Sequence, residues 1–335
     1  MTALQTLSDF FAQAQLDACY FTMGRHVAPL SAQHFRDFEE EKIAWEVPFG
    51  GHARFAVVLK APEQSPRDAA VWCLALPLDE LGKLDPQARD GLLRRLAEQV
   101  GERPSGEALQ DPLKDNPLAF KPDDFARAAL HAYAARALQL EEKTKADAAR
   151  RYYTQPTAGD DWQQLDYQSV ADMCATKDAL LEQRLAAQLA LLPAAPATAL
   201  CRMLEHFPVT QEALLKALEQ RATDDPERAG DCWRAIVSSH HPAAAAMVEQ
   251  LLSNSPTVEQ LAIISARGWH WLEHEQRLNL YLMALAQQPD IDVAACVRDI
   301  AQLPRLRLLV VMALRNAREE SLLKRRLRAD MKGEN

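Results

Sequence analysis

Residues 242–268 read PAAAAMVEQLLSNSPTVEQLAIISARG, and this stretch decides the fold of the larger part of the chain. It contains two apolar segments of similar length, each of which follows a proline. Proline suits the first turn of a helix, and Thr257 with Gln260 has the spacing of a capping box at the start of the second segment. The stretch therefore predicts two short helices joined by a tight turn, with Gly268 as the C-terminal cap of the second.

The same spacing continues in both directions along the chain. Prolines separated by 15, 18, 16, 14, 33 and 15 residues occur at Pro193, Pro208, Pro226, Pro242, Pro256, Pro289 and Pro304. Gly268 lies near the missing break in the longest interval. A helix of about 12 residues and a turn, recurring every ~16 residues, predict helical hairpins that stack in a HEAT-like manner. An irregular helical bundle is the alternative.

The first third of the chain has a different composition. Seven of the 11 glycines lie within residues 1–106. Alternating apolar residues predict strands at 19–23, 54–60 and 71–76. Apolar residues at helical spacing predict helices at 6–16, 32–41 and 85–100. We therefore expect a small antiparallel sheet with helices packed on it.

Together these patterns predict an α+β N-terminal domain followed by an all-α C-terminal domain of HEAT-like helical hairpins. We expect the α+β domain to take residues 1–106, a proline-rich ordered linker to take 107–122, and the helical-repeat domain to take 123–335. Prolines in the linker break any continuous helix. Beyond it, helical spacing predicts one long helix over 123–144 and a basic helix over 305–332.

Composition excludes several classes of protein. The 335 residues carry a net charge of −9, and the six scattered cysteines include no CxxC pair. The N-terminus has no basic signal region, and no apolar run reaches the ~18 residues that cross a bilayer. The longest candidate, Leu308–Leu314, is too short and lies among arginines. We expect a cytoplasmic protein that contacts no membrane, with Cys174, Cys201 and Cys232 reduced in the core.

No assembled catalytic motif is present, because Walker A, GxGxxG and GxSxG patterns are all missing. We expect no cofactor. The best acid–base grouping follows the last predicted strand, where Asp79 and Glu80 stand in a turn, with Asp90 and His52 as further candidates. Such groups catalyse only when they reach a substrate together. A turn also favours aspartate for its side-chain hydrogen bonds to the backbone.

Two further clusters have structural explanations. His270 and His274 have the i, i+4 spacing of a shared metal on a helix, but no third ligand is evident, and packing beside tryptophans is the simpler interpretation. We expect no metal. The acidic run Glu39–Glu41 could bind a cation, but a solvated helix face is the simpler interpretation.

The C-terminal segment is strongly basic. Between Arg305 and Lys332 it holds nine basic and three acidic residues. Such a segment could bind phosphates or an acidic protein surface. Favourable charge placement near a helix C-terminus, with an electrostatic match to the acidic remainder, is the simpler interpretation. The candidate binding residues are Arg25, Arg315, Arg318, Lys324, Arg325, Arg326 and Arg328.

Several phrases in the first third occur together in a known family: Phe21-Thr-Met23-Gly24-Arg25, Phe35-Arg-Asp-Phe38-Glu39, Pro48-Phe49, His52-Ala53, Trp72 with Pro77-Leu78-Asp79-Glu80-Leu-Gly82, Ala88-Arg89-Asp90, and Asp115-Asn116-Pro117-Leu-Ala-Phe120-Lys121-Pro122. The chain resembles an uncharacterised bacterial family, mainly gammaproteobacterial, that is defined as a domain of unknown function. The resemblance is strongest over residues 20–125. It implies no activity, ligand or catalytic residue.

The leading functional hypothesis is a non-enzymatic adaptor whose α-solenoid surface binds another protein. One alternative is an enzyme with acidic residues in an interdomain cleft. The other is binding of nucleic acid or another polyanion through the basic C-terminal helix.

Overall fold

The computed structural model describes residues 5–100, 113, 116–140, 143–155 and 161–333. The chain divides into two compact units, one of residues 1–141 with 302–304 and the other of 142–301 with 305–335. The first unit thus extends past the predicted linker. The expected fold class is confirmed, since a small antiparallel sheet with helices precedes a mostly helical region.

A four-stranded antiparallel sheet forms the centre of the first unit. In spatial order its strands are β2 (Ala28–Leu30), β1 (Asp17–Thr22), β3 (His52–Lys60) and β4 (Ala70–Pro77). The three predicted strands are confirmed. Strand β2 was not predicted, because three residues are too few to display an alternating pattern.

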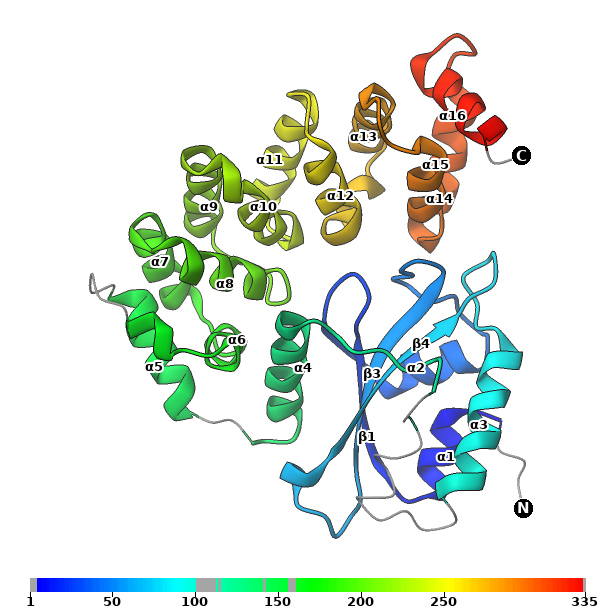
Figure 1. The fold of residues 1–335 in the computed structure, drawn as a ribbon, viewed down its shortest axis with the longest axis vertical. Coiled ribbons are helices and arrows are strands. Elements are labelled where there is room, and N and C mark those ends of the chain that lie inside the picture. The colour runs from blue at the N-terminus through cyan, green and yellow to red at the C-terminus, as the bar shows by residue number, and fades with distance from the viewer. Residues whose placement is uncertain (1–4, 101–112, 114–115, 141–142, 156–160, 334–335) are drawn as a thin grey trace. The chain divides into compact units, whose positions relative to one another are not determined.

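Helices cover both faces of this sheet (Figure 1). One face carries the helices α1 (Leu7–Gln13), α2 (Ala32–Glu39) and α3 (Pro86–Val100). The opposite face contacts α4 (Asp124–Ala137). Aromatic side chains fill the first interface, where the Phe35 ring stacks 4.3 Å from Tyr20 and the Phe11 ring lies 5.6 Å from Trp72. Strand pairing brings Tyr20, Val57 and Trp72 into one row on this face.

Glu39 corrects the expectation of a solvated acidic face. Its side chain is buried and accepts hydrogen bonds from the backbone N–H groups of Leu7 at 2.7 Å and Ser8 at 3.0 Å. These N–H groups belong to the first turn of α1, where no intrahelical acceptor exists. Glu39 therefore joins the end of α2 to the start of α1. The helical spacing of the sequence could not reveal this contact, since the two residues are 32 positions apart.

Helices of the second unit form a curved double row (Figure 1). The inner row contains α6 (Tyr167–Ala175), α8 (Ala194–Leu204), α10 (Ala229–Ser238), α12 (Val258–Arg267) and α14 (Val293–Ala301). The other row contains α5 (Lys143–Thr154), α7 (Ala179–Gln188), α9 (Glu212–Asp224), α11 (Pro242–Ser253) and α13 (Glu275–Gln287). Two more helices, α15 (Pro304–Asn316) and α16 (Leu322–Gly333), follow at the C-terminal end. The capping box of Thr257 with Gln260 and the C-cap at Gly268 are both confirmed.

Two predicted long helices are each divided into two. The helix expected over 123–144 ends at Ala137, and Gln139 then adopts a left-handed conformation with φ 57°. The basic helix expected over 305–332 ends at Asn316 and restarts after Ser321, whose hydroxyl accepts from the N–H of Lys324. Neither break carries the proline or glycine that marks most turns. The helical spacing of the sequence therefore predicts a continuous helix across each break.

Charged side chains link helices that are about one hairpin apart in sequence. Glu182 on α7 is fully buried and accepts from the N–H groups of Thr210 at 2.8 Å and Gln211 at 2.7 Å, where α9 begins. Lys177 pairs with the same carboxylate. A second link runs from α9 back to α7. Arg221 on α9 donates to the backbone carbonyls of Leu189 and Leu192, just beyond α7.

A buried carboxylate also joins three helices of the inner row. Glu205, 1% exposed, lies at the end of α8 with its oxygens 3.3 Å from Arg267 Nε and 3.4 Å from Arg234 Nη1. Arg234 belongs to α10, and Arg267 ends α12. Burial lowers the pKa of Arg267, and the negative charge of Glu205 opposes that change. This cluster ties α8, α10 and α12 together.

Replacing Glu182 tests the cost of breaking one of these links. In Glu182→Gln the amide oxygen replaces only one carboxylate oxygen, and the charge opposite Lys177 is lost. We expect the free energy of unfolding to fall by roughly 3 kcal/mol, measured by urea titration. The control Glu212→Gln removes an exposed carboxylate from the same end of α9 and should change little. Equal stability of the two variants would contradict the proposed role.

The buried carboxyl group of Glu39 leads us to predict how the stability of the protein depends on pH. Burial raises the pKa of its carboxyl group, and the hydrogen bonds from Ser8 and Leu7 lower it by less. An acid with a raised pKa in the folded state stabilises that state below its ordinary pKa, and this contribution is lost as pH rises through the raised value. The stability of the wild type minus that of Glu39→Gln should therefore decrease from pH 4 towards pH 7. Urea unfolding at several pH values measures it, and an increase would show that burial is not the dominant cause.

Candidate functional site

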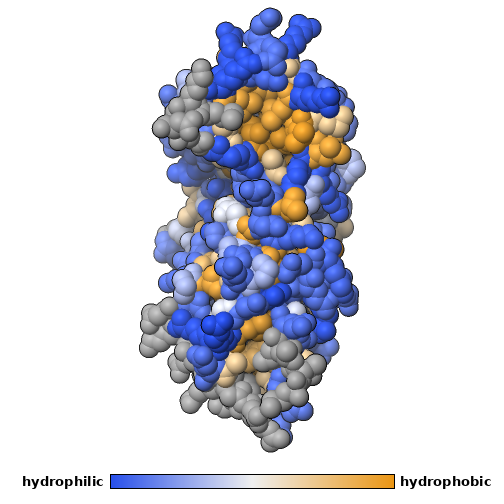
Figure 2. Space-filling model, turned by 90° about the vertical axis from the view of Figure 1, so that its right-hand side faces the viewer, coloured by the Kyte–Doolittle hydropathy of each residue, from blue (hydrophilic) through white to orange (hydrophobic). Residues whose placement is uncertain are grey.

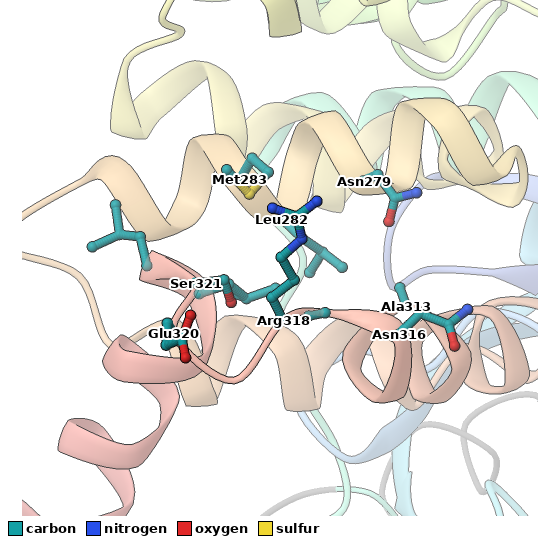
Figure 3. Close-up of a pocket in the computed structure, with 11 residues that line it drawn as sticks. Asn279, Leu282, Met283, Ala313, Asn316, Arg318, Glu320 and Ser321 are labelled. Atoms are coloured by element: carbon teal, nitrogen blue, oxygen red, sulfur yellow. The ribbon is translucent and has the colours of Figure 1, made fainter.

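A groove opens between α13 and the turn that joins α15 to α16 (Figure 3). Its volume is about 580 Å³. The residues that line this terminal groove are Asn279, Leu282, Met283, Ala313, Asn316, Ala317, Arg318, Glu320, Ser321, Leu322 and Leu323. Arg318 extends from the turn toward α13, close to Met283 in the view of Figure 3. Apolar side chains thus form part of the wall, and amide, hydroxyl and charged groups form the rest.

A second hollow of about 550 Å³ continues along α13. It is lined by residues from His274 to Met283 and shares Asn279 and Met283 with the terminal groove. Met283 is 45% exposed. The two hollows therefore adjoin each other along α13, and we call them together the recess.

The neighbouring helix α15 carries exposed apolar side chains. Leu308 is 68%, Val311 54% and Met312 51% exposed. Their i, i+3, i+4 spacing places all three on one side of the helix, and we call them the α15 stripe. Met312 stands one helical turn before Asn316, which lines the terminal groove, so the stripe and the groove share an edge. Figure 2 shows a broad hydrophobic region bordered by hydrophilic residues toward the end of the helical array.

The sequence signal for this stripe is the apolar run Leu308–Leu314, which is too short to cross a bilayer. Among the described residues no helix has the length and apolar character to cross a membrane. The same run supplies the exposed side of α15 instead.

The structure separates the basic residues of the C-terminal segment by their contacts. Arg326 donates to the backbone carbonyls of Gln288 at 2.8 Å and Ile291 at 2.7 Å. Lys324 and Arg328 both pair with Glu319. Three other arginines are exposed and form no ion pair within the described ranges: Arg315, Arg318 and Arg325. Part of the positive charge is therefore used within the fold.

Helix α16 is held at its far end as well. The Asp330 carboxylate accepts from the N–H of Val293 at 2.9 Å and from that of Ala294 at 3.4 Å. These groups open α14 and have no acceptor inside that helix. Asp330 and Arg326 thus attach α16 to the connection between α13 and α14, and this attachment builds one wall of the terminal groove.

The predicted acid–base residues have separate contacts in the first unit. His52 Nδ1 lies 2.7 Å from the Gly50 carbonyl oxygen. Asp79 accepts from two backbone N–H groups of its own turn, and Asp90 pairs with the adjacent Arg89. Glu80 is exposed. Across the described residues, no hydrogen bond or ion pair joins any two of the four candidates.

Arg25, a candidate for binding, is buried in the first unit. It is 1% exposed, and its Nε donates to the Pro48 carbonyl at 2.8 Å. The guanidinium carbon also lies 5.9 Å from the centre of the Phe49 ring. These contacts stabilise the chain where it leaves β1.

The two histidines expected on one helix lie in different elements. His270 belongs to a short 3-10 turn, with its ring centre 4.3 Å from that of His240, whereas His274 immediately precedes α13. Within the part of the chain that the structure describes, no group of three or more potential ligands could hold a metal ion.

The three cysteines expected in the core are buried. They lie in the second unit, where Cys201 and Cys232 have their sulfur atoms 3.9 Å apart. Burial raises the pKa of Cys174 to about 12. The reactive form of a cysteine is the thiolate, so this environment suits a packing residue.

Two adjacent arginines of α16 form a matched pair for a test, because Arg326 has internal hydrogen bonds and Arg325 is exposed. Arg326→Ala removes donors to two carbonyls, and we expect amide hydrogen exchange in α16 to become roughly tenfold faster. Arg325→Ala removes an exposed side chain of the same type and should leave the exchange rate unchanged. Equal rates in the two variants would show that Arg326 does not anchor the helix.

Comparison with known proteins gives a family but no relative of known activity. No curated protein and no solved structure matches the chain. One family model matches residues 2–329, which include the helical region as well as the N-terminal motifs. The chain therefore belongs to the family described as "Protein of unknown function (DUF3549)".

Proposed function

We propose that this protein is a non-enzymatic adaptor whose helical unit binds a polypeptide segment of another protein. The exposed α15 stripe beside the terminal groove carries the proposal. Fully burying an aliphatic side chain contributes about 1.5–3 kcal/mol, so covering the three residues of the stripe would supply a substantial part of a binding free energy. Such a surface is typical of a binding site.

The arrangement of the helices supports the same function. Hydrogen bonds between neighbouring hairpins join residues 26–34 positions apart, close to the period expected for HEAT-like hairpins. In stacked helical arrays each unit covers the apolar face of its neighbour. Among the described helices, α15 leaves an apolar stripe exposed. A helix from a partner would complete the packing.

Other functions have less support. Binding of a polyanion through the C-terminal segment must depend on the arginines that the fold leaves available, since Lys324, Arg326 and Arg328 have internal partners. Enzyme activity would require acid and base groups that meet, and the described contacts do not join them. A cytoplasmic location stays a prediction.

Site-specific photocrosslinking tests the adaptor function. A benzoylphenylalanine in place of Val311 lies within the α15 stripe, and one in place of Leu191, which is 70% exposed, lies elsewhere in the helical unit. In cells that make the protein, we expect discrete polypeptide adducts from position 311 and none of the same mass from position 191. Adding Leu308→Ser should reduce them several-fold without changing the melting temperature. Identical adducts at both positions, or none, would contradict the proposal.

A further inference from the structure

We propose that the partner segment is an amphipathic helix whose apolar stripe is flanked by acidic residues. This inference rests on the proposed function and identifies the chemistry of the occupant. Two arginines bracket the α15 stripe. Arg305, Leu308, Met312 and Arg315 follow one another at intervals of three or four residues, and this spacing keeps them on one side of α15. The two arginines are ten positions apart, which corresponds to about 15 Å along the helix.

A helix suits this surface better than an extended strand. Added strands bind to the free edge of a sheet, and the described part of the second unit contains no strand. The recess is bounded by helices on both sides, and Ala313 and Ala317 in its wall allow another backbone to come close. A helix laid in a groove presents apolar anchors at i, i+3 or i+4, and i+7. The α15 stripe offers apolar contacts at i, i+3 and i+4, which one or two such anchors would cover.

The charges beside the α15 stripe select for carboxylates. Arg315 is exposed without an ion pair among the described residues, and Arg305 is 73% exposed with Glu273 3.7 Å away. The recess itself carries both signs, since Arg318 and Glu320 line the groove and Glu275 lines the second hollow. The positive charge is therefore concentrated at the two ends of the stripe, where complementary charge on the partner fixes register and accelerates association.

A second copy of this chain is disfavoured as the occupant. A symmetric dimer brings the same patch of both copies together. If two α15 helices packed in antiparallel fashion, Arg305 of each copy would lie opposite Arg315 of the other. Like charges placed together are repulsive, and they weaken such an interface. An acidic helix instead places carboxylates opposite the same two arginines, and these pairs attract each other.

A selection from displayed helical peptides tests the inference on the full-length chain. The library keeps apolar residues at i, i+3 and i+7 and randomises the positions just outside them. Counter-selection uses Leu308→Ser/Met312→Ser, whose changes lie at exposed positions and should leave the melting temperature unchanged. We expect peptides with Asp or Glu at the outer positions to be enriched. A synthetic peptide of that sequence should bind at least tenfold more tightly than its lysine-flanked counterpart.

Charge reversal in the protein provides the second part of this experiment. The variant Arg305→Glu/Arg315→Glu should prefer the lysine-flanked peptide by a similar factor. Specific enrichment with no charge preference in either protein would overturn the acidic occupant and leave the adaptor function intact. No enrichment over the counter-selected variant would overturn both.

Two further measurements address other occupants. Sedimentation of the wild type alone, and flotation with vesicles of anionic phospholipid, are compared with the same double serine variant. We expect neither self-association nor vesicle binding to depend on the α15 stripe. Stripe-dependent dimers or stripe-dependent flotation, without peptide selection, would overturn the acidic helix and assign the surface to a second copy or to a lipid.

Discussion

Charged side chains that cap the ends of neighbouring helices are the interaction on which this structure depends. Every helix leaves N–H groups at its start and carbonyl groups at its end without intrahelical partners, so an array of short helices contains many such ends. Glu39 and Asp330 accept from the first turns of α1 and α14, and Glu182 accepts from the two residues that precede α9. Arg221 and Arg326 donate to carbonyls just beyond α7 and α13. Each contact satisfies a helix end and fixes the neighbour that supplies the charge.

This constraint also shapes the candidate site. Because Arg326 and Asp330 are used to attach α16, that helix stands where it closes one side of the terminal groove. Arg315 and Arg318 have no such task within the described contacts and remain at the rim. The same basic segment therefore contains residues that stabilise the fold and residues that are available to a partner. Net charge alone cannot distinguish them.

Much of the fold was predictable from local signals. Prolines and the capping box of Thr257 with Gln260 marked helix starts, because these residues act within a few positions of the chain. Alternating apolar residues located three strands. The predictions failed where the signal was not local. Gln139 ends α4 in a left-handed conformation that its residue type does not announce, and Glu39 is buried by a helix 32 positions away.

The sequence by itself determined that an α+β region precedes short helices, because periodicity and turn residues act over distances of one or two turns. It also determined that a basic, partly apolar segment ends the chain. Only the tertiary structure decided which charges are buried as caps and which stay exposed, since both kinds occur next to each other in the sequence, as Arg325 and Arg326 do. It also decided that Leu308, Val311 and Met312 stay at least half exposed. An apolar side chain becomes a candidate binding surface only when packing leaves it uncovered.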